Sequence, residues 1–451
     1  MNCIFICIFN QLSYVEMFYL LLESIFNFGN LDNNTHILIY TCTEFMNMIK
    51  QSNLFSKKIF FEINDTYTDI DKACKARLDL FYLPKIKNYD KILYLDTDIL
   101  IKGDIKNVFD VCKEDILYVL EEGEIDNDAD YWGKSLFENE VNNYHDKTAF
   151  TSGMLLFNNC DKIKFLFDRI IEDIHNRHHY FHDQPYIVYN AFKYNLYDNK
   201  ILKSFAVNND SNIHSDKVIH HFPGGPGVYH HKIVNMSNFL NNLKDFIICR
   251  NIETAKLYVT NFLLPVVRNS GELLEGNIFM THNTTHFSSE FSNKSKNISN
   301  LVLNKNIKNV MEIGFNSGFS TLLMLLSNPN ITVTCFDTGE HSYVNPCYKK
   351  MKETFGDRIN LIVGNSAKTL PNIHDIYDLI HIDGSKSCEI VTSDIINAYR
   401  LSRQGSVIIF NDYNFHHLSE PWNTFVNLYS LRKLNTTVYG CEEQDVKYVE
   451  K

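Results

Sequence analysis

The sequence feature that most restricts the fold is an alternation of apolar, strand-like runs with helix-like segments. The first part of the chain reads strand, helix, strand, helix, strand in the segments CIFICIF (3–9), VEMFYLLLESIFNF (15–28), THILIYT (35–41), KACKARLDLFYLPKI (72–86) and KILYLDTDILI (91–101). This order predicts a largely parallel sheet with helices packed on its faces. In such sheets functional side chains gather beyond the carboxyl ends of the strands.

The middle of the chain interrupts this rhythm. Residues 235–246 and 251–267 look helical, whereas HNTTHFSSEFSNKSKNISN (282–300) is polar and loop-like. A second series of strand-like runs then follows in NVMEIGFNSGFSTLLMLL (309–326), ITVTCFD (331–337), INLIVGNS (359–366), YDLIHID (377–383) and GSVIIFND (405–412). The predicted division is one α/β domain over residues 1–240, a helical and polar linker over 241–290 and a second α/β domain over 291–451.

Two carboxylates interrupt one of the predicted buried strands. Asp96 and Asp98 lie two residues apart, so on an extended segment their side chains point to the same side. Neighbouring carboxylates repel each other unless a cation lies between them, and oxygen ligands suit Mg²⁺ or Mn²⁺. An Asp-rich turn or a helix N-cap is the alternative, and the three residues Asp-Thr-Asp do not decide between the two.

Four motifs in a fixed order set this pair in a wider pattern. They are KARLDLFYLPKIKNYDKILYLDTD (75–98), TSGMLLFNN (151–159), the D-Q pair of YFHDQPYIVYNAF (180–192) and HFPG (221–224). With these motifs the chain resembles the glycogenin-like glycosyltransferases of family 8 over roughly residues 1–235. The resemblance implies a Rossmann-like fold of the glycosyltransferase A type and retaining transfer from a nucleotide sugar, most often a UDP-sugar.

The resemblance also implies roles for individual residues. Asp96, Asp98 and His221 would bind Mn²⁺ or Mg²⁺, and the H-F-x-G spacing favours His221 over the neighbouring His220. Contacts to the nucleotide sugar would come from Arg77, Ser152, Gly153 and Gly224. Asp183 and Gln184 would lie near the anomeric carbon and orient the sugar. No side chain stands out as a nucleophile.

The chain departs from the family pattern in two segments. The usual Asn-Ala-Gly is Thr151-Ser152-Gly153 here, so the contacts to the sugar differ. The usual K-P-W after the histidine motif is replaced by GGPGVYHHK (224–232), in which Lys232 is a candidate for the diphosphate contact. Asn10, at the end of the first strand, would contact the uridine side or serve as a polar turn residue.

A sugar-phosphate nucleotidyltransferase is the rival class for this half. Such enzymes hold a triphosphate with a glycine-rich, basic loop after the first strand. Here the first glycine is Gly29 and the first basic residue is Lys50. The sequence therefore excludes that class.

The second β/α series opens on a strand that ends in Glu312-Ile-Gly314-Phe-Asn-Ser-Gly318. Glycine at such a turn lets the backbone approach a ligand closely, although a plain tight turn has the same appearance. The spacing G-x-x-x-G disfavours a nicotinamide cofactor, which is typical of G-x-G-x-x-G. Polar residues follow the next four strands: Asp337, then Asn365 and Ser366, then Asp383, then Asn411 and Asp412.

This order of motifs, over residues 295–415, resembles the class I S-adenosylmethionine-dependent methyltransferases, in particular the catechol O-methyltransferase-like enzymes and methyltransferase family 24. The resemblance implies a second Rossmann-like fold. Residues that would bind S-adenosylmethionine are Glu312, Gly314, Gly318, Asp337, Asn365 and Ser366. Residues that would bind Mg²⁺ are Asp383, Asn411 and Asp412, although the last pair is reversed here. Lys386 would act as the base, unless it is an ordinary surface lysine.

Composition excludes other partners and predicts the compartment. The net charge of −11 gives no basic surface for nucleic acid, and no apolar stretch has the length of a membrane span. The eleven cysteines are scattered without disulfide or metal spacing, which favours a reducing, cytoplasmic compartment.

The two resemblances together predict a bifunctional enzyme that adds a sugar to a glycan or glycoprotein acceptor and then methylates a hydroxyl, most simply one on a sugar. Two alternatives stay open. The second half would be a non-catalytic binding module beside an active glycosyltransferase, or it would methylate an unrelated small molecule.

Overall fold

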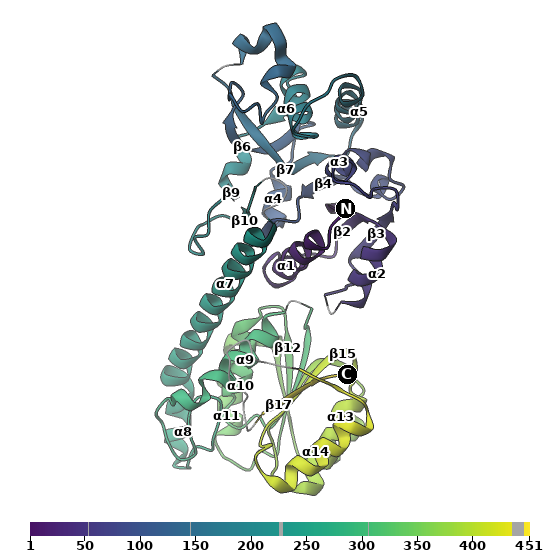
Figure 1. Ribbon diagram of the computed structural model, residues 1–451. Helices are drawn as coiled ribbons and strands as arrows, with labels where there is room; N and C mark the ends of the chain where they lie inside the picture. Colours follow the sequence, from purple (N-terminus) through teal and green to yellow (C-terminus); the bar gives the residue numbers. More distant parts are fainter. Residues whose placement is uncertain (53, 145, 225–228, 305, 435–445) are drawn as a thin grey trace. The chain divides into compact units, whose positions relative to one another are not determined.

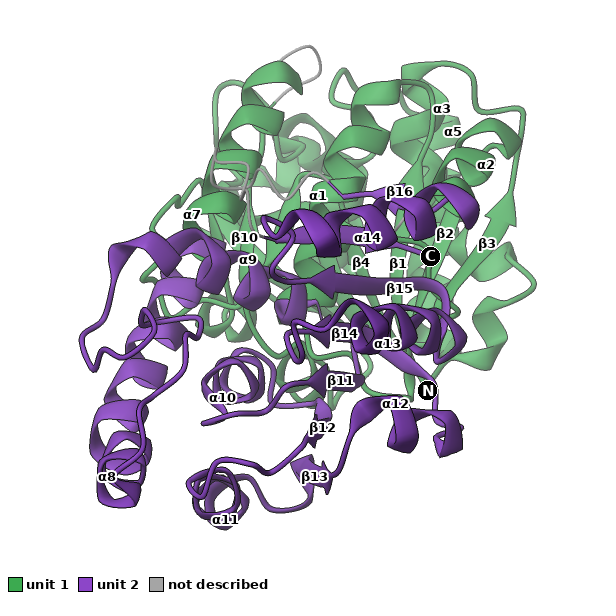
Figure 2. Cartoon of the chain, turned by 90° about the horizontal axis from the view of Figure 1, so that it is seen from below, with its two compact units in different colours: residues 1–243 green, residues 244–451 purple. Residues whose placement is uncertain are grey.

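The structure is a computed structural model that describes residues 1–52, 54–144, 146–224, 229–304, 306–434 and 446–451. It divides into two compact units, Met1–Leu243 and Lys244–Lys451 (Figure 2). The division falls within the long helix α7 (Tyr229–Tyr258). Both units are α/β and built on parallel-rich sheets, so the predicted fold class of two Rossmann-like domains is confirmed.

The first unit is built on a seven-stranded sheet in the order β3-β2-β1-β4-β7-β6-β8 (Figure 1). Strands β3, β2, β1 and β4 run parallel, whereas β7 is antiparallel to both β4 and β6. The strands are β1 (Asn2–Ile8), β2 (Thr35–Thr41), β3 (Ile59–Ile63), β4 (Lys91–Leu95), β6 (Leu117–Glu124), β7 (Thr148–Asn158) and β8 (Tyr197–Asp198).

Alternate residues of β1 enter two different cores, as the period of a strand requires. Ile4, Ile6 and Ile8 pack with helices of one face, and Cys3 and Phe5 pack with helices of the other. The first face carries α1 (Leu12–Phe28), α2 (Thr43–Gln51) and α4 (Lys106–Asp110), and the second carries α5 (Asp161–Asn176) and α6 (Gln184–Lys193).

The run KILYLDTDILI is two strands of two different sheets. After β4 the chain turns at Asp96–Asp98 and enters β5 (Ile99–Ile101), the edge of a three-stranded sheet with β10 (Ile219–His221) and β9 (Ala206–Asn208). The run is therefore not the single strand-like segment predicted, but Asp96 and Asp98 do follow a strand end, that of β4. A turn at this point keeps two carboxylates out of an apolar sheet, where they would be buried without partners.

The segment before β4 is also less regular than predicted. Its helix is α3 (Ile70–Lys75) followed by a 3₁₀ helix, η1 (Ala76–Tyr82), and Pro84 lies just beyond, where a residue without an N–H ends helical pairing. The remaining short 3₁₀ helices of this unit are η2 (Ile86–Asn88), η3 (Lys134–Asn143) and η4 (Ile201–Ser204).

The predicted linker, residues 241–290, belongs largely to the second unit. The helical prediction holds here, since α7 continues through a π-helical turn, η5 (Val259–Leu263), into α8 (Leu264–Ser270). Apolar residues of these helices and of the loop after them pack into the same core as the second sheet. They are Ile248, Ile252, Ala255, Val259, Leu263, Leu264, Val267, Leu274, Ile278, Phe279 and Met280.

The prediction of a loop over residues 282–300 is wrong for its second half. After the 3₁₀ turn η6 (Ser289–Phe291), helix α9 (Ser292–Leu303) packs against α10, and the Ser299 and Ser327 hydroxyls lie 2.7 Å apart. The helical signal is the apolar spacing of Ile298 and Val302, which enter the core, and it is weak beside the many Asn and Ser residues around it.

The second unit is built on a seven-stranded sheet in the order β13-β12-β11-β14-β15-β17-β16. All neighbours from β13 to β15 are parallel, and β17 is antiparallel to β15 and β16. The strands are β11 (Asn309–Ile313), β12 (Thr332–Asp337), β13 (Ile359–Val363), β14 (Tyr377–Ile382), β15 (Ser402–Phe410), β16 (Arg432–Lys433) and β17 (Lys447–Glu450).

Helices cover both faces of this sheet (Figures 1 and 2). One face packs against α10 (Phe319–Ser327) and α11 (Val344–Phe355), and the other against α13 (Cys388–Arg400) and α14 (His416–Leu428). The short α12 (Ser366–Thr369) and the 3₁₀ turns η7 (Gly356–Arg358) and η8 (Leu370–Asn372) complete the connections. Because the strands are parallel, the polar residues after β11, β12, β13, β14 and β15 share one edge of the sheet.

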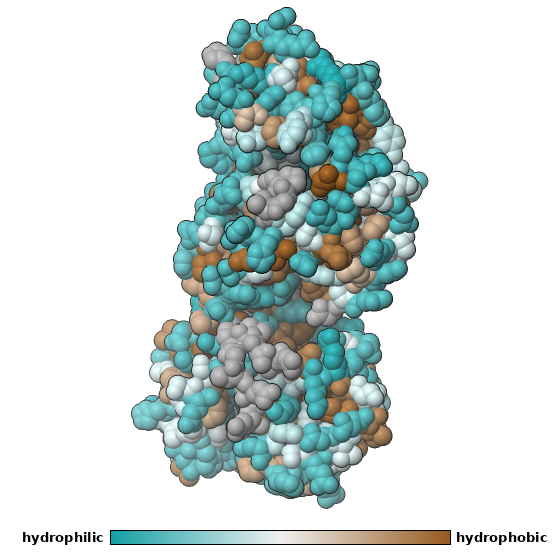
Figure 3. All heavy atoms as spheres, in the orientation of Figure 1, coloured by the Kyte–Doolittle hydropathy of each residue, from teal (hydrophilic) through white to brown (hydrophobic). Residues whose placement is uncertain are grey.

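Hydrophilic residues cover most of the face seen in Figure 3, with apolar residues in small scattered groups. Among the described residues, the helices include none with the length and apolar character needed to cross a bilayer.

Candidate functional site

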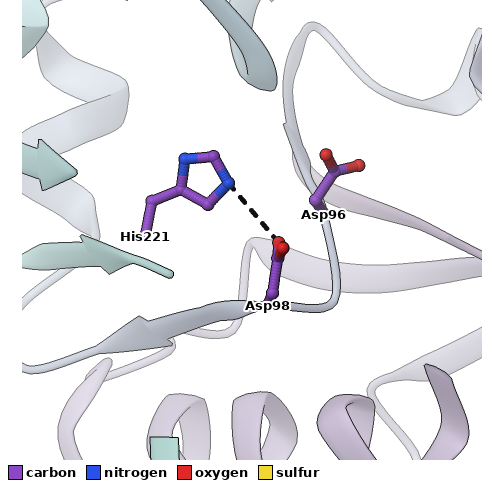
Figure 4. A group of neighbouring side chains, drawn as sticks. All are labelled: Asp96, Asp98 and His221. Atoms are coloured by element: carbon purple, nitrogen blue, oxygen red, sulfur yellow. Dashed lines mark ion pairs between the residues drawn. The ribbon is translucent and has the colours of Figure 1, made fainter. Parts of the chain in front are cut away.

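Asp96, Asp98 and His221 converge at the end of β4 (Figure 4). Asp96 and Asp98 form the turn between β4 and β5, and His221 is the last residue of β10. Antiparallel pairing of β10 with β5 sets His221 opposite Ile99, directly beside Asp98. One ligand atom from each of the three side chains lies within 4.8 Å of the others.

Asp98 is buried, and its two oxygens have different surroundings. Oδ2 is 2.5 Å from Lys232 Nζ, whereas Oδ1 has no hydrogen-bond partner among the described residues and lies 3.4 Å from His221 Nε2. Burial opposes ionisation, but the charges of His221 and Lys232 outweigh it and hold the pKa of Asp98 below its usual range. His221 Nδ1 is 2.9 Å from Asn208 Oδ1, which leaves Nε2 to face the site.

Gly153 lets β7 approach these side chains closely. Asp96 N–H donates to Gly153 O at 2.8 Å, so the glycine lies beside the site in the neighbouring strand. A Cβ atom at this position would lie 2.7 Å from His221 Cε1, 2.8 Å from His221 Nε2 and 3.0 Å from Asp96 Oδ2. The sequence prediction linked Gly153 to the sugar, and the structure gives it this further steric role.

The three side chains fit a divalent cation. Two carboxylates and one imidazole are a ligand set that Mn²⁺ accepts, and a buried carboxylate oxygen without a hydrogen bond is an open coordination position. His220, the alternative ligand, is buried elsewhere, with Nδ1 2.9 Å from Asp210 O and its ring against Phe239. The geometry thus favours His221, as the sequence spacing did.

A second buried cluster lies next to the predicted metal ligands. Arg77 donates from Nε to Asp183 Oδ2 at 2.7 Å and from Nη2 to Asp183 Oδ1 at 3.1 Å. Its Nη1 donates to Ser152 O at 2.5 Å and lies 3.5 Å from Asp96 Oδ1, and its guanidinium stacks over the Tyr94 ring. Burial opposes the charge of Arg77, but Asp183, Tyr94 and Asp96 together outweigh it and raise the pKa of Arg77. Arg77 thus links Asp183 to Asp96, one of the predicted metal ligands.

Gln184 is tied to the same strand as Gly153. Its Oε1 accepts from Ser152 N and Ser152 Oγ, both at 3.1 Å, and its Nε2 donates to Tyr131 O at 3.3 Å. Asp183 and Gln184 are therefore held by Arg77 and Ser152, which brings four of the predicted residues into one network.

Two predicted residues lie at the margins of this network. Asn10 follows β1 in the left-handed backbone region, at φ 73°, and Gly224 is exposed after β10. Residues 225–228 of the altered segment lie outside the described part of the chain.

In the second unit, the glycine turn after β11 brings the backbone close to that of Asp383. Gly314 has φ +96°, and a Cβ atom there would lie 2.0 Å from Asp383 O. Gly318 has φ +79° and starts α10. Asp337 holds the turn, since its carboxylate accepts from Asn316 N at 2.7 Å and from Gly339 N at 2.8 Å. Asn365 caps α12 by accepting from Ala367 N at 2.9 Å, and Ser366 opens that helix.

Glu312 faces the sheet interior rather than the turn. It is fully buried, accepts from the Thr321 hydroxyl, and its Oε1 lies 2.9 Å from Nδ1 of the equally buried His381 in the adjacent strand. The arrangement makes Glu312 an anchor of the strands on which the glycine turn is built. A direct contact with the cofactor stays a prediction.

The predicted second metal centre has a different composition from the first. Asn411 Nδ2 donates to Asp383 Oδ1 at 2.5 Å, and Lys294 Nζ on α9 lies 3.4 Å from Asp383 Oδ2. Lys294 and His381 outweigh burial and lower the pKa of Asp383. Asp412 lies just beyond, in the left-handed region at φ 61°. Both oxygens of Asp383 thus already face a donor or a cation, whereas Asp98 Oδ1 has no hydrogen-bond partner among the described residues, so this set fits a divalent ion less well than the first.

Lys386, the predicted base, is exposed near this cluster. Its Nζ lies 4.9 Å from the centre of the Phe415 ring, and its backbone oxygen is 3.1 Å from His417 Nε2. Both the catalytic and the surface interpretation remain compatible with this position.

Sequence reasoning missed several side chains of these sites. Lys294 precedes Asp383 by 89 residues and lies in a segment with no strand-end pattern. Asn208, which orients His221, lies outside the quoted motifs, and Tyr94, which donates to Asp96, lies inside one of them but was given no role. Each acts through a contact that only the folded chain creates.

Comparison with known proteins supports both of the domain types predicted from the sequence. A family model described as glycosyl transferase family 8 matches residues 24–197, and one described as a methyltransferase domain matches residues 311–413. The chain is thus a two-domain transferase. It carries a family 8 glycosyltransferase domain followed by an S-adenosylmethionine-dependent methyltransferase domain, as predicted.

Solved structures similar to parts of the chain come from both classes. Mouse xyloside xylosyltransferase 1 is 13% identical, with 49% of this chain and 98% of that chain covered and a TM-score of 0.37. An O-methyltransferase from Bacillus cereus in complex with SAH is 19% identical, with 44% and 100% covered and a TM-score of 0.31. An SAH-bound methyltransferase from Podospora anserina is 18% identical, with 36% and 79% covered and a TM-score of 0.29. No curated protein matches the chain.

Proposed function

We propose that the protein modifies glycans in two steps. The first domain transfers a sugar from a UDP-sugar to a glycan or glycoprotein acceptor with the aid of Mn²⁺ or Mg²⁺, and the second O-methylates a hydroxyl, most simply one on the sugar. The observation that carries the proposal is the convergence of Asp96, Asp98 and His221 around an unbonded oxygen of Asp98.

In the first domain, Asp96, Asp98 and His221 would hold the cation. When bound, it supplies positive charge that stabilises the diphosphate as it leaves the sugar. Lys232, 2.5 Å from Asp98, adds a second positive charge on the side where a diphosphate would lie. Arg77 would be a positioning residue here, because its guanidinium contacts Asp183, Ser152 and Asp96. Retention of configuration rests on the family resemblance.

Asp183 and Gln184 would orient the donor sugar. Asp183 is buried and held in a bidentate pair, so its position is fixed before any substrate binds. The Ser152 hydroxyl and N–H hold Gln184 Oε1, which leaves the amide nitrogen for the Tyr131 carbonyl or for substrate.

In the second domain, the Gly314 turn and Asp337 would bind S-adenosylmethionine. The methyl carbon would pass from the sulfonium to the acceptor hydroxyl oxygen. Lys386, as the neutral amine, would accept the proton of that hydroxyl, and the electron pair of the carbon–sulfur bond would stay on sulfur. Tethering both domains in one chain would raise the concentration of the first product near the second site.

The free thiols of the ten described cysteines favour the cytoplasm as the compartment.

The deciding experiment measures nucleotide release from UDP-, GDP- and dTDP-sugars by the full chain, with and without Mn²⁺. We expect release from a UDP-sugar that needs the cation and is lost in Asp98→Asn. Asp128→Asn, at a fully exposed aspartate, is the matched control and should behave as the wild type. Release without added cation in the presence of a chelator, or release by Asp98→Asn at the wild-type rate, would refute the first step.

The second step is tested by methylation of the first domain's product. With labelled S-adenosylmethionine, we expect label in the glycosylated acceptor and little in the free acceptor. Equal labelling of both, or transfer only to unrelated small hydroxyl compounds, would refute a sugar hydroxyl as the target. Absence of S-adenosylmethionine binding by calorimetry would instead favour a non-catalytic binding module.

A further inference from the structure

The environment of Asp383 is occupied by positive and hydrogen-bond-donating groups. Lys294 Nζ lies 3.4 Å from Oδ2, Asn411 Nδ2 donates to Oδ1 at 2.5 Å, and His381 Nε2 lies 3.8 Å from Oδ2. The Lys294 side chain is only 10% exposed, although a lysine is normally solvated. Each oxygen of the Asp383 carboxylate therefore already faces a positive or hydrogen-bond-donating group.

The contrast with the first domain is informative, because there too a lysine lies near an aspartate. Lys232 contacts only Oδ2 of Asp98, while Oδ1 remains unbonded and two further ligand side chains converge on it. Within the described residues, Asp96, Asp98 and His221 are the one group of three His, Cys, Asp or Glu side chains close enough to share an ion. At Asp383 the converging groups are an ammonium and an amide N–H₂.

A divalent ion at Asp383 would meet unfavourable electrostatics. It would have to lie beside the buried Lys294 ammonium, where like charges at short range repel strongly because little water screens them. The Asp383 carboxylate already balances the Lys294 ammonium. A divalent ion would add two positive charges beside this pair.

We propose that the ammonium of Lys294 stands in the place of the divalent cation in the second domain, and that this domain binds and uses no divalent cation. The role of Lys294 in catalysis rests on the proposed methyl transfer. The absence of a divalent cation is argued from the Asp383 cluster alone. With one N–H directed to Asp383, the ammonium has two further N–H groups. These would orient an acceptor hydroxyl and stabilise the negative charge that grows on its oxygen.

The test is the number of tight Mn²⁺ sites on the full chain, measured by electron paramagnetic resonance and calorimetry. Wild type should hold one, and Asp98→Asn should hold none. Lys294→Met should gain a second site, with affinity at least tenfold tighter than any residual binding in the parent, and Asp98→Asn/Lys294→Met should keep one. Lys308→Met, at an exposed lysine of the same unit, is the matched control and should equal wild type.

Two outcomes would overturn the proposal: a tight site that persists in Asp98→Asn, or a Lys294→Met protein that binds S-adenosylmethionine as wild type but gains no site. The first outcome needs no variant of Lys294, so it holds even if that variant fails to fold. If the wild-type protein held no tight Mn²⁺ site, that result would count only against the proposed metal site of the first domain. Methyl transfer should also keep its rate within twofold in excess chelator, whereas sugar transfer should stop.

Discussion

Gly153→Ala is the sharpest steric test of the metal site in the first domain. Ordinary van der Waals contact begins near 3.4 Å, and the new Cβ would lie 2.7 Å from His221 Cε1, 2.8 Å from its Nε2 and 3.0 Å from Asp96 Oδ2. The ligands must therefore move by roughly 0.4 to 0.7 Å, whereas metal–ligand distances tolerate about 0.2 Å.

We expect a displacement of this size to weaken Mn²⁺ binding by at least the 10- to 100-fold typical of changes in the groups that orient metal ligands. That range corresponds to about 1.4 to 2.7 kcal/mol of binding free energy. Global stability should change by less than about 1 kcal/mol, because the residue does not need the left-handed backbone region and only side-chain ends must move.

The assay is a calorimetric Mn²⁺ titration beside the rate of nucleotide release at saturating donor, with thermal unfolding as a check on folding. Gly103→Ala is the matched control, because its Cβ would meet Val218 Cγ2 at an ordinary 3.5 Å. If Gly153→Ala binds Mn²⁺ and releases nucleotide as Gly103→Ala does, then His221 and Asp96 do not form the metal site described above.

Two further predictions concern stability. Arg77→Met leaves the carboxylate of Asp183 buried without its ion pair, so denaturant unfolding should show a loss of about 3 to 5 kcal/mol, and a loss below about 1 kcal/mol would contradict the pairing. Burial raises the pKa of Asp394 from 3.8 to about 6, with the nearby Ser366 hydroxyl offsetting only part of the effect, so ionisation destabilises the native state as pH rises from about 4 to 6. Asp394→Asn should therefore gain up to about 3 kcal/mol over wild type at pH 8 and nothing at pH 4; an equal gain at both pH values would be inconsistent with a buried ionised carboxylate.

The sequence predicted those features that follow from strand period and strand ends. Apolar runs gave the parallel core of both sheets, and residues just after a run, such as Asp96 and Asp383, lie at the carboxyl edge as expected. His221 was reached only through its motif, since 122 residues separate it from its strand partner Ile99. Spacing along the chain says nothing about such pairing, and the ordered motifs supplied the missing information.

What the sequence could not predict is which charges meet across elements. Arg77 and Asp183 are each recognisable, yet only the fold makes them a bidentate pair. Lys294 is the stronger case, because it stands in a polar segment that predicts a loop and becomes a buried neighbour of Asp383 only when α9 forms. An aspartate at a strand end can therefore face a lysine from a helix elsewhere in the sequence, as Asp383 faces Lys294. A motif match identifies the carboxylate, but it does not identify the cation that neutralises it.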